Sequence, residues 1–316
     1  MIRLCIAVTV ALTVVAAGVY GQDITKDVAD ILALDRDAYY QHILDDFKKL
    51  NDEEIVAVTK AVRDRRATFH GDSKLGIIYG AFEDYYKSIG PQNGAQFQQM
   101  IIGYIQQHPD MITPRVMLVR ALISDAWRSR GDGAANTVSK EGWAGFEKNL
   151  KAAKKYAQDA LALDEKDPEL YTELITITRA LNGSEEDMFD YAKHGLELDP
   201  MYLTVPSTFA NFMLPRWGAA DTAEKRVAEF CADNTKDAVG DSLYFYIARC
   251  VSDMDGPWSV IKAQHFDWPR LKKAYADYGV HFIHNSRLDN MMACFACAAG
   301  AGRGGPCWKA AGPRRR

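Results

Sequence analysis

A near-repeat in the middle of the chain constrains the fold more than any other feature of the sequence. Within Lys151–Pro200, a pattern that begins Tyr-Ala and ends Leu-x-Leu-Asp runs from Tyr156 to Asp164 and returns from Tyr191 to Asp199, 35 residues later. One helix pair cannot bury both of its apolar faces, whereas stacked pairs share a continuous core. The repeat therefore predicts a solenoid of helix pairs.

Start and stop signals divide this repeat into two helices. Asp167 can cap the first, and Pro168 suits its first turn, where the missing N–H would have no partner anyway. Ser184 is the expected cap of the second helix, which Asp199-Pro200 ends. Between these signals, four apolar residues fall on one helical face: Leu170, Leu174, Ile177 and Leu181.

The helix before this pair carries small residues at spacings of four and three, which allow two helices to approach closely. They are Ala153, Ala157 and Ala160. This arrangement resembles the second helix of a tetratricopeptide repeat, and Tyr171 and Leu174 match two large positions of the first helix. Ile175 stands where that motif has glycine, and Thr178 where it has an aromatic residue. We therefore expect degenerate repeats.

The other segments also show helical periodicity, and none shows the alternation or hairpin signals of a sheet. The predicted fold is all-α: a tetratricopeptide-like solenoid of antiparallel helix pairs with degenerate repeats and no sheet. We divide the chain into a signal peptide (1–21), an N-terminal helical region (22–112), tetratricopeptide-like core repeats (113–200), a C-terminal helical region (201–300) and a terminal segment (301–316).

Three further helix starts follow from local residue chemistry. Asn51 and Glu54 have the spacing of a capping box, in which Asn51 accepts from the third helical N–H and Glu54 reaches back. Asp221–Glu224 repeats that spacing, and Thr113-Pro114 has the chemistry of a cap followed by a first-turn proline.

The first 21 residues have the pattern of a secretory signal peptide. Arg3 is their only charge, Cys5–Val19 is an uncharged and mainly apolar run, and cleavage is expected after Gly21 or Gly18. The run is too short for a membrane-spanning helix, and an uncleaved anchor is the alternative. We expect a secreted or periplasmic bacterial protein that meets the membrane only through this segment.

Five cysteines remain after cleavage, and an odd number argues against a complete disulfide framework. Cys294 and Cys297 form a CxxC within a predicted helix, Ser286–Ala299. We interpret these thiols as buried structural groups, with a disulfide or redox pair and a zinc site as alternatives. The final segment, 301–316, carries five positive charges and no acid, which indicates a disordered basic tail or the frameshifted end of a last helix pair.

One group of residues forms a hypothetical ligand site. About a dozen residues follow the helix that ends near Arg130, many more than a minimal helix-pair turn, and expanded loops often carry function. If this loop folds toward the turn at Leu214–Gly218, arginine forks and indoles line a pocket for carboxylate, phosphate, sugar or apolar groups. The candidate residues are Trp127, Arg128, Arg130, Asp132, Trp143, Arg216 and Trp217. The alternative is structural: arginines that cap helix ends and tryptophans that fill the core.

The same segments resemble a bacterial family known as domain of unknown function 4034 (DUF 4034), over roughly Asp35 to Gly300. The likeness lies in Trp127–Gly133, in Trp143 and Phe146, in the helix pair around Leu163–Pro168, and in Leu214–Gly218. The resemblance implies a tetratricopeptide-like fold and carries no activity to this chain.

Composition and motifs exclude several function classes. The formal net charge is −4, so there is no basic signature for nucleic acid. No hydrolase, zinc-protease, phosphate-loop or dinucleotide motif is present, and we assign no catalytic residue, cofactor or metal ligand. We therefore expect a non-enzymatic scaffold that binds a protein, peptide or envelope component. The alternative is an enzyme or small-ligand receptor whose site joins the loop 128–143 to the turn 214–218.

Overall fold

The computed structural model describes residues 20–214, 217–220 and 222–301, and these residues form an all-α helical solenoid. Most of the expected signal peptide, Pro215, Arg216, Asp221 and the segment 302–316 lie outside this part of the chain. Export, the second capping box and the nature of the terminal segment therefore stay predictions. None of the helices in the described residues is both long and apolar enough to cross a bilayer.

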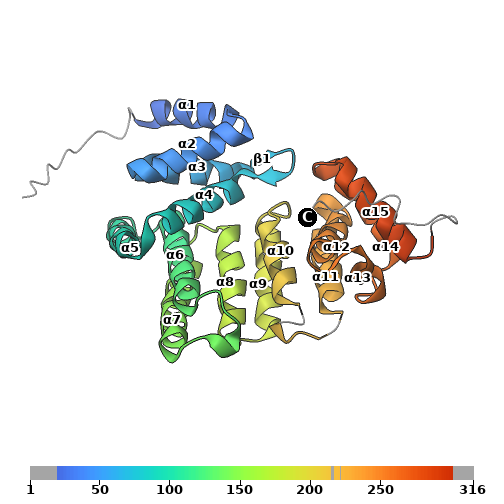
Figure 1. The fold of residues 1–316 in the computed structure, drawn as a ribbon. Helices are drawn as coiled ribbons and strands as arrows, with labels where there is room; N and C mark the ends of the chain where they lie inside the picture. The colour runs from blue at the N-terminus through green and yellow to red at the C-terminus, as the bar shows by residue number, and fades with distance from the viewer. Residues whose placement is uncertain (1–19, 215–216, 221, 302–316) are drawn as a thin grey trace, which may run out of the picture.

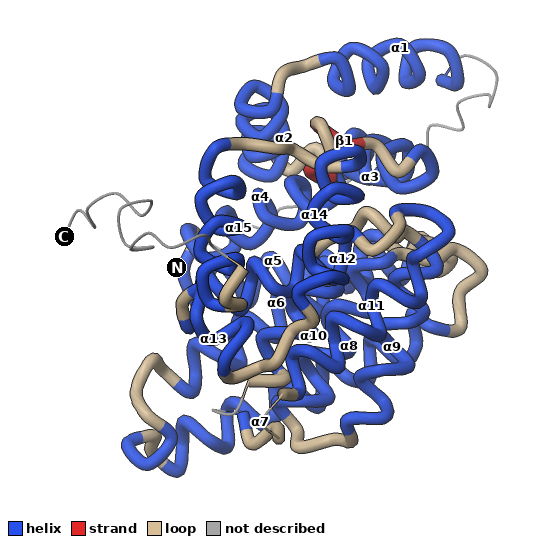
Figure 2. The backbone as a smooth tube through the Cα atoms, turned by 90° about the vertical axis from the view of Figure 1, so that its right-hand side faces the viewer, coloured by secondary structure: helices blue, strands red, loops and turns tan. Residues whose placement is uncertain are grey.

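The N-terminal helices lie across one end of the others (Figure 1). They are α1 (Tyr20–Ala33), α2 (Arg36–Lys49), α3 (Asp52–Arg65), α4 (Lys74–Ser88) and α5 (Gly90–Gln107). A small antiparallel pair of strands, β1 (Thr68–Phe69) and β2 (Asp72–Ser73), joins α3 to α4, as Figure 2 shows.

The remaining helices stand side by side as neighbouring pairs, α6 against α7, α8 against α9, and α11 against α12 (Figure 1). The middle group is α6 (Thr113–Arg130), α7 (Lys140–Leu161), α8 (Pro168–Ala180) and α9 (Glu185–Leu198), with a 3-10 turn at Ala135–Thr137. The last group is α10 (Thr204–Phe212), α11 (Ala223–Val239), α12 (Ser242–Asp255), α13 (Pro257–Lys262), α14 (Trp268–His281) and α15 (Ser286–Ala298).

Small residues let the central helices pack closely, as the repeat predicts. Ala153, Ala157 and Ala160 on α7 are fully buried. In the second copy of the repeat, Gly195 takes the place of Ala160, and a methyl group there would lie 2.9 Å from Val205 Cγ2. The copies thus share a close helix contact, while the type of repeat stays a prediction.

The two central caps expected from the sequence are confirmed. Asp167 accepts a hydrogen bond from the Glu169 amide at 2.9 Å, and Ser184 accepts one from the Asp187 amide at 3.0 Å. Ser139 likewise caps α7 by accepting from the Gly142 amide at 2.9 Å. Each cap satisfies a backbone donor that has no partner inside its helix.

Three local predictions are wrong. A short hairpin exists, because His70 and Gly71 both take positive φ (50° and 90°), the geometry of a two-residue hairpin turn. Asn51 precedes α3, but it makes no side-chain cap; its amide donates to Glu54 Oε2 at 2.7 Å instead. Thr113 is the first residue of α6 rather than its cap, and its hydroxyl accepts from Arg63.

Candidate functional site

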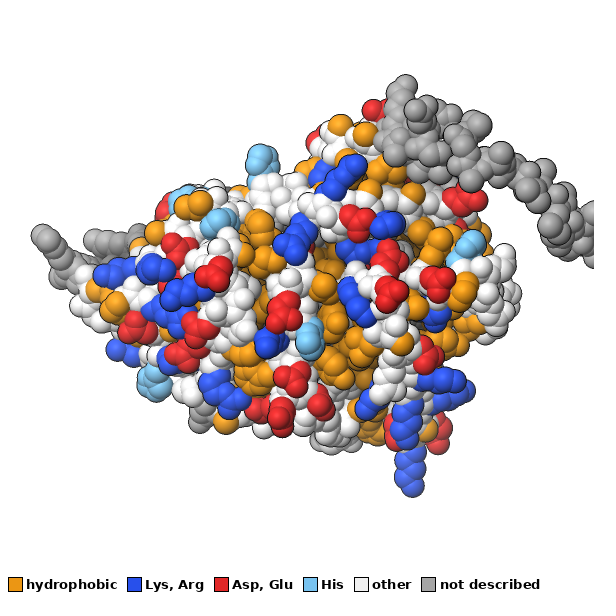
Figure 3. Space-filling view, turned by 180° about the vertical axis from the view of Figure 1, so that it is seen from behind, with side chains coloured by type: hydrophobic (Ala, Val, Ile, Leu, Met, Phe, Trp, Pro, Cys, Tyr) orange, Lys and Arg blue, Asp and Glu red, His pale blue; other side chains and the backbone are white. Residues whose placement is uncertain are grey.

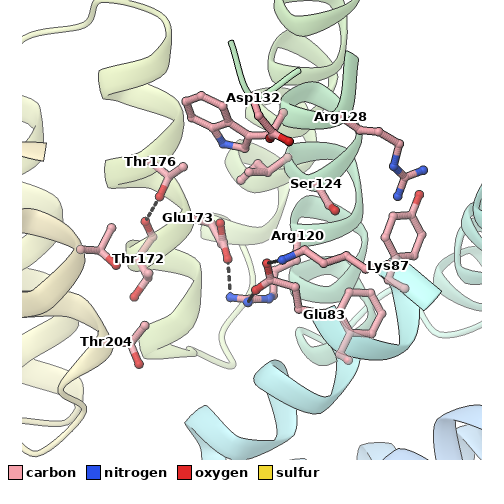
Figure 4. Close-up of a pocket in the computed structure, with 15 residues that line it drawn as sticks. Glu83, Lys87, Arg120, Ser124, Arg128, Asp132, Thr172, Glu173, Thr176 and Thr204 are labelled. Carbon is pink, nitrogen blue, oxygen red and sulfur yellow. Dashed lines mark hydrogen bonds and ion pairs between the residues drawn. The ribbon is translucent and has the colours of Figure 1, made fainter. Parts of the chain in front are cut away.

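A pocket of about 580 Å³ opens between α4, α6, α8 and α10 (Figure 4). Its floor is polar and charged, one wall is a row of threonines, and the opposite wall is aromatic. On the rear face of the molecule, side chains of both charge signs are interspersed with apolar side chains (Figure 3). A site that combines fixed polar groups with aromatic surface suits ligand binding.

Arg120 on α6 lies at the floor and is held by three carboxylates. It donates to Glu173 Oε1 at 2.6 Å and to Glu83 Oε2 at 2.7 Å, and it also pairs with Glu169. Lys87 pairs with the other oxygen of Glu83 at 2.5 Å. The guanidinium on α6 is therefore fixed from two further helices, because the carboxylates come from α4 and α8.

Burial and charge act in opposite directions on these groups. Burial alone would lower the pKa of Arg120, but Glu173 and Glu83 outweigh it and raise that pKa. Burial raises the pKa of Glu173, and the nearby charge of Arg120 offsets this rise only in part. At Glu83, the raising effect of burial is outweighed by Arg120 and Lys87, so its pKa is lowered. The cluster thus keeps a charged guanidinium in the interior.

The threonine row consists of Thr172 and Thr176 on α8 and Thr204 and Thr208 on α10. Figure 4 shows the first three on one side of the pocket, with Arg120 and Glu83 facing them. Thr176 donates to the Thr172 carbonyl at 3.1 Å. Thr172 is only 4% exposed, and its hydroxyl has no hydrogen-bond partner in the described residues. A buried hydroxyl without a partner is costly unless a bound group or water satisfies it.

The aromatic wall consists of Phe82 and Tyr86 on α4 and Trp127 on α6. The Tyr86 hydroxyl donates to Asp125 at 3.0 Å, and Gln98 donates to that hydroxyl at 2.7 Å. Arg128 lies over the Tyr86 ring at 5.5 Å and pairs with Asp125 at 3.0 Å. These contacts hold the Tyr86 ring in place within the wall.

A second buried network supports the pocket from behind. Asp167, fully buried, accepts from Tyr79 at 2.6 Å and from Arg63 at 2.9 Å. Burial raises the pKa of Asp167, and Arg63 opposes that change. Tyr202 donates to Glu169 Oε2 at 2.5 Å, which links the two networks through α8. The position of Glu169 against Arg120 is thereby set.

The seven residues of the predicted site divide into three sets. Trp127, Arg128 and Asp132 line the pocket. Arg130 and Trp217 pack on Trp127, Trp143 packs on Arg130 and Phe146, and these three residues do not line the pocket. Arg216 lies outside the described residues, so its place in the site stays a prediction.

Arg130 holds the expanded loop that follows α6 in place. Arg130 stacks on the rings of Trp127 and Trp143 at 5.7 and 5.3 Å and donates to the carbonyls of Gly131 and Gly133, both at 3.0 Å. The Trp217 ring meets Trp127 edge-on at 6.2 Å. Arg130 therefore braces the loop, whereas Trp143 is 39% exposed and does not fill the core, so the predicted ligand site stays a prediction.

Arg120, Glu83, Glu173 and the threonine row are not among the residues predicted from the sequence. One signal for them exists: Arg120 is the only charged residue in the run Val116–Ile123, where α6 is otherwise apolar and mostly buried. A charge inside such a run needs partners. Glu169 and Glu173, four residues apart on α8, are candidates on the sequence, but only the fold shows that they face Arg120.

Most charged side chains of the pocket are paired with one another. The described residues that line it include neither histidine nor cysteine, and its two glutamates are both paired with Arg120. A third acidic residue, Asp132, also lines the pocket.

The cysteines do not contribute to this pocket. Cys231 is a buried free thiol whose pKa is raised by burial. Cys294 is free and Cys297 is in a disulfide bond, so the two cysteines of the CxxC are not bonded to each other. The group with metal-ligand chemistry in the described residues is His42, Asp46 and Glu54, on α2 and α3.

No family model matches the chain, and comparison with curated proteins and with solved structures found no match either. The resemblance to DUF 4034 stays a prediction.

Proposed function

We propose that this protein is a non-enzymatic binding module whose pocket holds an extended peptide segment of a partner protein. The observation that carries the proposal is the pocket of about 580 Å³ between four helices, with a floor of fixed, paired charges and two chemically different walls. Helical arrays commonly bind partners on such surfaces.

The two walls fit the two kinds of group in an extended peptide. Threonine hydroxyls donate and accept, so the threonine row suits the alternating N–H and C=O groups of a backbone. The aromatic wall suits an apolar side chain. Three cationic and three acidic side chains line the pocket, which favours a peptide with little net charge: Lys87, Arg120 and Arg128 against Glu83, Asp132 and Glu173.

A peptide library displayed on phage tests this proposal. The bait is the wild-type protein, and the blocked variant is Thr208→Arg, which places a long side chain in the pocket at a half-buried position. The matched control is Thr178→Arg, a half-buried threonine on α8 that does not line the pocket. We expect wild type and T178R to enrich one consensus that contains an apolar residue, and T208R to lose it.

A consensus that T208R enriches as well would place peptide binding elsewhere on the surface. Equal recovery from all three baits, without a consensus, would contradict peptide binding. Circular dichroism melts of the three proteins check that T208R remains folded.

A small-ligand receptor is the second candidate, because the pocket volume lies in the range of small-molecule sites, roughly 300–1,000 Å³. Trp127 and Arg128 line one end and would meet such a ligand. A fragment screen by ligand-observed NMR, with T208R as the blocked protein, separates this candidate from the first: small molecules would bind although no peptide is enriched.

We also propose export, on the pattern of residues 1–21. A fusion of residues 1–30 to an enzyme that is active only outside the cytoplasm should give activity, and a Val10→Arg change within the apolar run should abolish it. Equal activity of both fusions would contradict a signal peptide.

A further inference from the structure

His42 lies between two carboxylates where α2 meets the start of α3. Its Nε2 atom is 2.7 Å from Glu54 Oε1 and 3.3 Å from Asp46 Oδ2. His42 and Asp46 are one turn apart on α2, and Glu54 comes from the first turn of α3. All three ligand atoms lie within 4.8 Å of one another.

The single hydrogen that His42 Nε2 can carry does not satisfy both of the carboxylate oxygens that face it. One imidazole nitrogen carries at most one hydrogen, yet Nε2 faces an oxygen of each carboxylate. Asp46 is 3% exposed, and its Oδ2 atom accepts no hydrogen bond in the described residues. No lysine or arginine of the described chain pairs with Asp46 or Glu54; the nearby Lys48 pairs with Asp45 instead. Two carboxylate oxygens therefore converge on one imidazole nitrogen, which can donate to only one of them, and the Asp46 carboxyl also lies within hydrogen-bond reach of Asn51 and Glu54.

Asn51 orients the second carboxylate. Its side-chain amide donates to Glu54 Oε2 at 2.7 Å, which turns Oε1 toward His42. A fixed hydrogen bond to the outer oxygen of a ligand carboxylate is typical of second-layer support in metal sites. It also explains why Asn51 does not cap α3.

We propose that His42, Asp46 and Glu54 bind a divalent cation of the zinc class, with water in the remaining positions. Zinc lies about 2.0–2.2 Å from nitrogen and carboxylate ligands, so tetrahedral ligand atoms are about 3.3 Å apart. The His42–Asp46 distance already has that value. The His42–Glu54 distance must widen by about 0.6 Å, from 2.7 Å to about 3.3 Å, which the partly exposed Glu54 side chain (29%) permits.

The ligand set decides the class of ion. Imidazole nitrogen favours zinc and its transition-metal neighbours, whereas calcium and magnesium prefer oxygen ligands alone. Since the three ligands come from α2 and α3, the bound cation would tie these helices together and stabilise the N-terminal end of the solenoid. This inference is independent of the proposed peptide binding.

The test titrates the full chain with zinc chloride against a chromophoric chelator. The site variants are His42→Gln and Glu54→Gln. The matched control is His194→Gln, because His194 also faces a carboxylate, Glu197 at 3.3 Å, but only one. We expect H42Q and E54Q to bind one equivalent fewer than wild type, or the same equivalent at least about tenfold more weakly. H194Q should bind as wild type does, and zinc should raise the melting temperature of wild type and H194Q only.

Equal stoichiometry and affinity in wild type, H42Q and E54Q would overturn the proposal. If the variants unfold, X-ray absorption of the wild-type protein with one equivalent of zinc decides the question. Nitrogen and oxygen neighbours at about 2.0–2.2 Å support the site, and a sulfur neighbour at about 2.3 Å assigns the zinc to a cysteine instead.

Discussion

Arg120 faces three carboxylates in the interior of the helical array. Its positive charge offsets the cost of burying these carboxylates. Its side chain is 13% exposed, and those of Glu169 and Glu173 are 1% and 7% exposed. A buried pair adds little net stability, since both charges lose their hydration. Removal of one partner costs about 3–5 kcal/mol because the other charge stays buried and unpaired.

Replacement of Arg120 by Met should therefore destabilise the protein by about 3–5 kcal/mol in urea unfolding. Methionine keeps an unbranched stem, so the loss comes from the charge. Arg226→Met is the control: Arg226 pairs with Glu185 at 3.0 Å, but its side chain is 51% exposed, so the expected loss is below about 1 kcal/mol. Similar losses in both variants would show that the carboxylates around Arg120 are not confined to the interior.

Asp241 gives a prediction that depends on pH. Burial would raise its pKa, but hydrogen bonds from Lys273 (2.7 Å) and Arg270 (3.0 Å) outweigh burial and hold the pKa below 3.8. A carboxyl with a lowered folded-state pKa stabilises the fold above its unfolded pKa and loses this effect as pH falls through the folded value.

We expect Asp241→Asn to cost about 1 kcal/mol at pH 7, a value reduced by solvent screening because Lys273 is 56% exposed. Thermal melts at pH 7, 4 and 2.5 should show the gap between wild type and variant closing toward the lowest pH. A gap that stays constant would contradict the assigned role of the charge.

At the residue scale, the sequence could predict which side chains carry chemistry but not which of them meet. The long loop that follows α6 predicts Trp127, Arg128 and Asp132 as site residues, and these three line the pocket. The same loop predicts Arg130, yet Arg130 stacks on Trp127 and Trp143. Residue type does not distinguish these outcomes, since both depend on how α6 is rotated against α8.

At the scale of single elements, prediction succeeded where the cause is local. Asp167 and Ser184 begin helices because their side chains serve backbone donors two or three residues away. It failed where a distant group competes, as at Thr113, whose hydroxyl accepts from Arg63 50 residues earlier in the chain. Prediction also failed at the hairpin around His70-Gly71. Its strands, β1 and β2, have two residues each, so the sequence shows no alternating pattern there.

The caps should differ in strength because their surroundings differ. Ser184→Ala removes one exposed cap and should cost about 1 kcal/mol in urea unfolding. Asp167→Ala removes a cap and also leaves Arg63 and Tyr79 without their shared buried acceptor, so we expect a loss above about 3 kcal/mol. Equal costs would mean that Asp167 acts only as a cap.

At the scale of the whole molecule, the fold departs from a simple solenoid. In a simple solenoid each repeat contacts only its neighbours, and segments unfold nearly independently. Here Arg63 on α3 bonds to Asp167, 104 residues further along the chain, at the start of α8. It also pairs with Glu165, which accepts from the Ile112 amide at 3.1 Å. The N-terminal helices are therefore fastened directly to the central repeats.

This fastening predicts how the molecule opens in hydrogen exchange. Arg63→Met leaves Asp167 buried without its cation, which should weaken α3 and the first turn of α8 by about 3 kcal/mol, equivalent to roughly 100-fold faster exchange there. Amides of α12 should keep their protection. Arg287→Met is the control, because Arg287 also joins distant segments by pairing with Asp253 at 2.6 Å, but its side chain is 70% exposed. In Arg287→Met, exchange around Arg287 and Asp253 should change less than about threefold. If exchange in Arg63→Met instead became faster in all helices to the same extent, the molecule would open as one cooperative unit, and the contact of Arg63 with Asp167 would not be a local tie.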